Sequence, residues 1–215
     1  MRQMLTGKSL QPVRIATPAS GPRTLLVRLR STAEPSGATQ AEKGAWADGL
    51  VSDGWSVLDL GCASDDDVAA AIGDALGQLH DVSSAAGGPQ LIVLAEHGLA
   101  CTAARALVAL DQQKAAAPAC GLVTIDAFAE VAFPAVAEQL AHQPGVAALW
   151  TVTRGEPVVR AATFAHHAAL QAQRHDSRYL VVPKTSGGLS TLAADRQSAF
   201  GRELRWLLAP VNSRN

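Results

Sequence analysis

The chain has 215 residues, of which 48 % are hydrophobic and 17 % are charged, and its formal net charge is −1. This composition belongs to a chain that buries one globular core, and it excludes a disordered protein. The lysines and arginines are scattered, so no basic stripe points to nucleic-acid binding. No apolar run approaches the roughly 20 residues that cross a bilayer, and residues 1–18 lack the apolar centre of a secretory signal, so we expect a cytoplasmic protein.

The three cysteines give no sign of a metal site. Cys62, Cys101 and Cys120 have no metal-ligand spacing and cannot form a complete set of disulfides. Cys62 and Cys120 flank apolar runs, and we expect them to be small core residues. The glycine-rich stretch 184–190 (KTSGGLS) lacks the spacing of a phosphate-binding loop, so we expect no metal and no cofactor.

Residues 1–22 contain Pro12, Pro18 and Pro22 and are predicted to form an extended N-terminal arm, with room for a short edge strand at 12–16. From 23 to 210, apolar runs alternate with helical patterns, which predicts one domain followed by a short tail at 211–215. The runs predicted as strands are 24–29, 55–60, 91–94, 121–125, 146–153 and 178–182. The stretches predicted as helices are 41–52, 68–80, 99–110, 133–142, 161–174 and 195–208.

The predicted strands are continuous apolar runs and do not alternate with period two. This pattern indicates an α/β fold of three layers, in which a mostly parallel sheet has helices on both faces. Functional sites in such sheets form beyond the carboxyl ends of the strands.

The stretch 91–110 (LIVLAEHGLACTAARALVAL) joins a predicted strand to a predicted helix through the turn that contains His97. This layout carries the nucleophile in α/β-hydrolases, where a serine stands between glycines. Here the serine is absent, and Ala95 and Leu99 stand where the flanking glycines would be. The substitutions argue against the sharp, strained turn itself.

Three stretches resemble the α/β-hydrolase superfamily, over about residues 24–210. Besides the turn at His97, LWTVTRGEPVV resembles the strand and turn that present the acid, and RYLVVPKTSGGLS resembles the last strand and the histidine loop. DGWSVLDL and AALQAQRHDSRYLVVP resemble, within the superfamily, a bacterial family of unknown function whose members are often short of a full triad. The resemblance implies a compact, lid-less α/β-hydrolase-like domain.

The same resemblance implies a degenerate catalytic triad. The nucleophile position falls on His97, or on the glycine after it if the turn is shifted by one. The acid position falls near Glu156, with Asp126 as the other strand-end candidate, and the histidine position falls on Gly187 or Gly188. Since a serine hydrolase needs nucleophile and base in contact, we expect that the chain is not an enzyme.

Two side chains could still do chemistry. His97 would lie at a helix N-terminus, where it could bind an anion, act as a neutral imidazole, or simply fill the former serine site. Cys101 lies four residues later, where a thiol pKa can be lowered, but we expect it to be structural. His166 and His167 are adjacent on one predicted helix, so they point in different directions and would not bind one ion.

We therefore predict a catalytically inactive protein that acts as a structural or binding subunit of a homo-oligomer or larger assembly, through its arm and the 30–40 loop. One alternative is a weak esterase-like or Cys/His hydrolase that uses His97, Cys101 and Glu156. The other is a small-molecule binder that uses the vacated active-site pocket.

Overall fold

The computed structural model describes residues 11–16, 24–31, 50–62, 68–82, 90–112, 120–143, 146–153, 156–182 and 195–208. The predictions on Gly187, Gly188, most of the 30–40 loop and the 211–215 tail lie outside these residues. For this reason the lid-less character of the domain stays a prediction.

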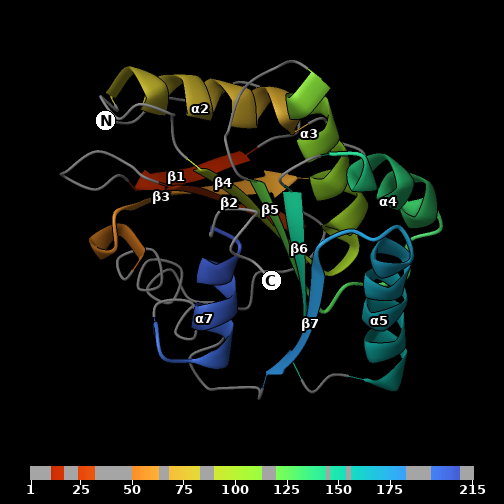
Figure 1. Cartoon of the computed structure of the whole chain (residues 1–215). Helices are drawn as coiled ribbons and strands as arrows, with labels where there is room; N and C mark the ends of the chain where they lie inside the picture. Colours follow the sequence, from red (N-terminus) through yellow and green to blue (C-terminus); the bar gives the residue numbers. More distant parts are fainter. Residues whose placement is uncertain are drawn as a thin grey trace.

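The described strands form one seven-stranded sheet in the order β1-β3-β2-β4-β5-β6-β7 (Figure 1). All neighbouring pairs are parallel except β1 with β3, which is antiparallel. The strands are β1 Gln11–Ala16, β2 Thr24–Ser31, β3 Trp55–Cys62, β4 Gln90–Glu96, β5 Cys120–Ile125, β6 Val146–Thr153 and β7 Ser177–Val182. The predicted arm of residues 1–22 thus contributes an edge strand to the sheet.

Helices cover both faces of the sheet, as the continuous apolar strands predict (Figure 1). The helices are α2 Ala69–Val82, α3 Ala100–Gln112, α4 Phe133–Ala141, α5 Pro157–Ala172 and α7 Ala199–Trp206. The first four lie on one face and α7 lies on the other (Figure 1). None of the helices in the described ranges is long and apolar enough to cross a membrane.

Alternate residues of strands β2 to β6 supply two separate cores. On β2, Leu25, Val27 and Leu29 pack with α2, α3 and α4, while Leu26 packs on the opposite face with Phe200 of α7 and its neighbours. This alternation confirms the predicted three-layer α/β fold, because strands that are buried on both sides need apolar residues at successive positions.

Two predicted helix starts are wrong by four residues, since α7 begins at Ala199 and not at Asp195, and α5 begins early. Helix α5 begins at Pro157, four residues before the predicted start at Ala161. Proline suits the first turn of a helix because its missing N–H would have no helical partner there and its φ is already helical. The sequence RGEP reads as a turn, but its proline starts the helix that follows.

Candidate functional site

The turn between β4 and α3 forms the sharp elbow that the substitutions at Ala95 and Leu99 argued against. Strand β4 ends at Glu96, a 3-10 turn covers His97–Leu99, and α3 begins at Ala100. His97 has φ 51°, in the left-handed region that residues other than glycine rarely adopt. The chain therefore holds a strained backbone at His97, the residue on which the sequence resemblance places the nucleophile position.

The imidazole of His97 is half-buried, and its Nδ1 atom is enclosed by protein. The ring stacks on Phe128, with centroids 5.2 Å apart and an interplanar angle of 28°. The Phe128 N–H also donates to the His97 carbonyl, with an N···O distance of 3.3 Å. Both backbone and side chain of Phe128 thus contact the histidine.

Phe128 belongs to a short segment, residues 126–130, that follows β5 and lies against the elbow. Asp126 begins it with φ 47°, and its carboxylate accepts hydrogen bonds from the Thr153 N–H (2.8 Å) and the Thr153 hydroxyl (2.5 Å) at the end of β6. The Ala127 carbonyl accepts a hydrogen bond from Oγ1 of Thr163 on α5 (3.1 Å). The predicted acid candidate Asp126 is therefore an anchor between two strand ends.

Glu130 ends the same segment and caps α3. Its carboxylate accepts hydrogen bonds from the backbone N–H groups of Ala100 (3.0 Å) and Cys101 (3.2 Å). An anion at this place satisfies helix donors that have no partner within the helix, and it interacts favourably with the helix dipole. The sequence analysis missed Glu130, since it lies 30 residues from the helix that it caps.

Cys101 is buried in the first turn of α3. Its side chain is 5 % exposed, and burial, reinforced by the carboxylate of Glu130, raises the pKa of its thiol to about 12. A thiol with this pKa stays protonated at neutral pH and is not a nucleophile. Cys62 is fully buried in the core, as predicted, whereas the side chain of Cys120 is outside the described set.

The remaining acid candidate, Glu156, is exposed and immediately precedes α5. It follows β6, so it lies at the same carboxyl edge of the sheet as the elbow. The described residues contain no group of three or more His, Cys, Asp or Glu that could hold a metal ion.

Two ion pairs near the elbow were also missed by the sequence analysis. Nε of Arg28 donates to Glu96, the residue before His97, at 2.7 Å. Nε of Arg30 donates to Asp59 on β3, also at 2.7 Å. Charges in a largely buried place need such partners, and the pairs link β2 to the strands on both its sides.

His166 and His167 point in different directions, as predicted, yet both are buried. The His166 ring lies between Phe133 and Trp150, at centroid distances of 4.2 and 5.4 Å. Nδ1 of His167 is 2.8 Å from Oγ of Ser177, which also accepts a hydrogen bond from Trp150 (3.1 Å). Burial lowers the pKa of both histidines, that of His166 to about 4.

No family model matches the sequence, and no curated protein matches it. The narrower resemblance to a bacterial family of unknown function therefore stays a prediction.

Solved structures do match the fold. The esterase Est22 is 10 % identical, with a TM-score of 0.60 over 94 % of this chain and 82 % of its own. Est1E from Butyrivibrio proteoclasticus is 10 % identical, with a TM-score of 0.56 over 94 % of this chain and 100 % of its own. A hormone-sensitive lipase from a metagenome library is 8 % identical, with a TM-score of 0.59 over 97 % of this chain and 89 % of its own.

These neighbours correct the expectation that the chain is not an enzyme, because they are named as esterases and a lipase and point to a hydrolase. That expectation was based on the absence of a serine and a histidine from the positions of the catalytic triad in the sequence. At this level of identity the likeness itself establishes the fold, and the strand order with its elbow after β4 agrees with it. The chain therefore has the α/β-hydrolase fold.

Proposed function

We propose that the protein is a slow acyl-ester hydrolase in which His97 is the nucleophile. The observation that carries the proposal is the strained backbone of His97, with φ 51°, at the turn between β4 and α3. Such strain persists where the surrounding structure enforces it, and it clusters at functional sites. The hydrolase neighbours support the same reaction class.

The proposed reaction has two steps. The lone pair of Nε2 of His97 attacks the acyl carbonyl carbon, the ester C–O bond breaks, and the alcohol leaves with its bonding electrons and takes a proton from water, which leaves an acyl-imidazolium and hydroxide. Hydroxide then attacks the acyl carbon, the C–N bond breaks with its electrons returning to Nε2, and the products are the carboxylic acid, which ionises in water, and the restored imidazole. We assign the attack to Nε2 because Nδ1 is enclosed by protein.

Glu130 explains why the reaction would be slow. Its carboxylate occupies two N–H groups at the start of α3. A helix N-terminus stabilises the oxyanion of an acyl-transfer transition state, and an anion already bound there weakens this effect. Activated esters, whose leaving groups need little assistance, are therefore the substrates to test.

The decisive measurement is the hydrolysis of p-nitrophenyl acetate by the wild type and by His97→Ala. We expect turnover to fall on the order of 100-fold in the variant, because a positioned histidine contributes at least this much. Mass spectrometry of the rapidly quenched wild type should find an acetyl group on His97.

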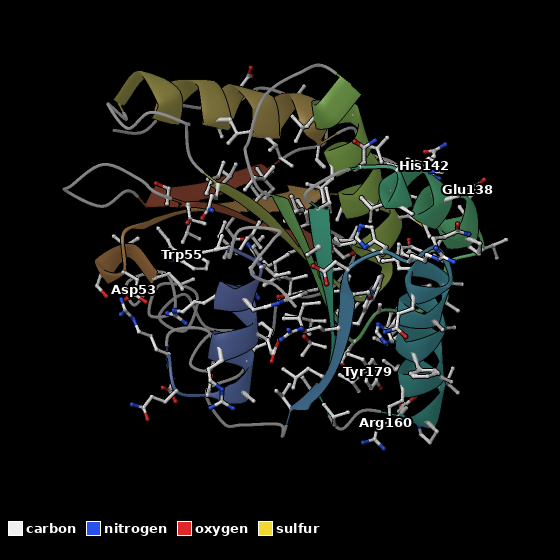
Figure 2. All side chains as sticks on the ribbon, in the orientation of Figure 1. Asp53, Trp55, Glu138, His142, Arg160 and Tyr179 are labelled. Atoms are coloured by element: carbon white, nitrogen blue, oxygen red, sulfur yellow. The ribbon has the colours of Figure 1, made fainter. Side chains whose placement is uncertain are left out.

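Surface histidines also react with activated esters, so the matched control is His142→Ala. His142 is exposed next to the end of α4, where its Nδ1 lies 2.6 Å from the carbonyl of Glu138 (Figure 2). This variant should keep wild-type turnover. Equal rates in both variants would refute the proposal.

The assembly role and the cytoplasmic location stay predictions. The arm and loop that were expected to contact a partner lie mostly outside the described residues.

A further inference from the structure

We propose that Phe128 is the acyl-binding wall of this site and selects esters with an apolar acyl chain. The inference rests on the proposed function and names the substrate class and the residue that determines it.

The first argument is the position of the Phe128 ring. It stacks on the His97 imidazole, and a β-carbon placed on Gly98 would lie 3.9 Å from its Cδ2 atom. The ring thus covers the elbow on one side. Phe128 is nevertheless 44 % exposed, so it offers an apolar face to any group that is bonded to Nε2 of His97.

The second argument is that the segment that carries Phe128 is held at both ends. The carboxylate of Asp126 accepts hydrogen bonds from Thr153 on β6, and the carboxylate of Glu130 accepts hydrogen bonds from the first N–H groups of α3. The carbonyl of Ala127 is held by Thr163. A wall that is fixed before binding loses little conformational entropy when an acyl chain packs against it.

The third argument is that apolar exposure continues around this edge of the sheet. Val131 follows the segment and is fully exposed, and Val158 in the first turn of α5 is 74 % exposed. Both follow strand ends, β5 and β6, at the carboxyl edge that carries His97. Exposed apolar side chains that follow the same strand ends as the proposed site favour an apolar ligand there.

The test compares kcat/KM for p-nitrophenyl octanoate and p-nitrophenyl acetate. We expect Phe128→Ala to lower the octanoate-to-acetate ratio by about 10-fold or more, because the variant removes the apolar surface that the longer chain covers. Phe128→Leu keeps an apolar wall and should retain most of the ratio.

The matched control is Phe164→Ala on α5. Phe164 is 55 % exposed, similar to Phe128, but its ring packs on Tyr179 and His167, whereas the ring of Phe128 stacks on His97. Its removal should leave the ratio unchanged. An equal loss on both esters in Phe128→Ala would overturn the inference, since Phe128 would then only hold His97 in place.

A binding measurement separates this inference from the proposed reaction. Calorimetry with octanoate and acetate needs no turnover, and octanoate should bind the wild type more tightly, with the preference lost in Phe128→Ala. Absent turnover with this preference intact would refute the reaction alone. His97-dependent turnover with no octanoate preference would refute the wall alone.

Discussion

Backbone strain at single residues shapes the site. His97 and Asp126 have φ values of 51° and 47°, and they lie at the ends of the neighbouring strands β4 and β5. A residue with a β-carbon in this region costs on the order of 1 kcal/mol or more. The hydrogen bond from the Phe128 N–H to the His97 carbonyl and the bonds of Asp126 to Thr153 offset part of this cost.

The strain at His97 can be measured by comparing His97→Gly with His97→Ala. Both variants lose the imidazole and its stacking on Phe128, but only glycine adopts φ near 51° without a steric cost. We expect the glycine variant to have a free energy of unfolding about 1 kcal/mol higher than the alanine variant, in urea denaturation. Equal stability would mean that the elbow relaxes when the ring is removed.

Glu130 controls the thiol of Cys101 as well as the start of α3. Glu130→Gln removes the negative charge that, together with burial, raises the pKa of Cys101 to about 12. We expect the pKa to fall while it stays above its ordinary value, because burial is the largest cause and remains. Thiolate absorbance as a function of pH gives this value, and Cys101→Ser is the blank for the assay.

Helix α7 is too short to be stable alone and depends on its tertiary contacts. It has eight residues, too few for an isolated helix, and it buries Phe200 and Leu204 on the sheet. Asp53 forms an ion pair with Arg205 of α7 and another with Arg196, which precedes the helix. Asp53 lies with Trp55 where the chain enters β3, beside α7 (Figure 2).

Asp53→Asn should loosen α7. Hydrogen bonds to the arginines hold the pKa of Asp53 below its ordinary value, so its stabilising effect is complete above about pH 4 and is lost as the carboxylate takes up a proton in stronger acid. We expect the variant to lose on the order of 1 kcal/mol of stability at pH 7, because the ion pairs are partly exposed to solvent, which weakens them. Amide hydrogen exchange should then accelerate first in α7, and uniform acceleration across the sheet would contradict this assignment.

At the scale of the whole molecule, the buried histidines of α5 make the fold sensitive to acid. His166 packs against Phe133 of α4 and Trp150 of β6, and His167 packs against Tyr179 of β7, which Figure 2 labels. Burial keeps both rings neutral in the folded protein, whereas the unfolded chain binds protons at ordinary values.

Acid unfolding should therefore begin well above the range in which the carboxylates titrate. In the folded protein the pKa of His166 is about 4, whereas its ordinary value, which applies in the unfolded chain, is 6.5. Between these two values the unfolded chain binds a proton that the folded protein does not, so the free energy of unfolding falls as the pH decreases from 6.5 to 4. This shift corresponds to a loss of about 3 kcal/mol. The free energy of unfolding, measured by urea denaturation from pH 7 to pH 4, should depend much less on pH in His166→Phe than in the wild type. The same pH dependence in both proteins would refute His166 as the cause.

The sequence alone determined the α/β class, the alternation of strands and helices, and the elbow stretch. These features depend on residues that are neighbours in the chain, because burial on two faces produces continuous apolar strands and local hydrogen bonding produces helices. The strand β6 has the predicted bounds for this reason. Even the position of His97 at the turn follows from the local pattern.

Only the tertiary structure decided what surrounds His97. Phe128 and Glu130 are about 30 residues away, and they reach the elbow because β5 pairs with β4 and their chains leave the sheet at one edge. His97 has its strained φ although no glycines flank the turn. The segment 126–130 contacts the turn there, through the hydrogen bond from the Phe128 N–H to the His97 carbonyl. Contacts between segments far apart in the chain depend on strand order, which no local periodicity encodes.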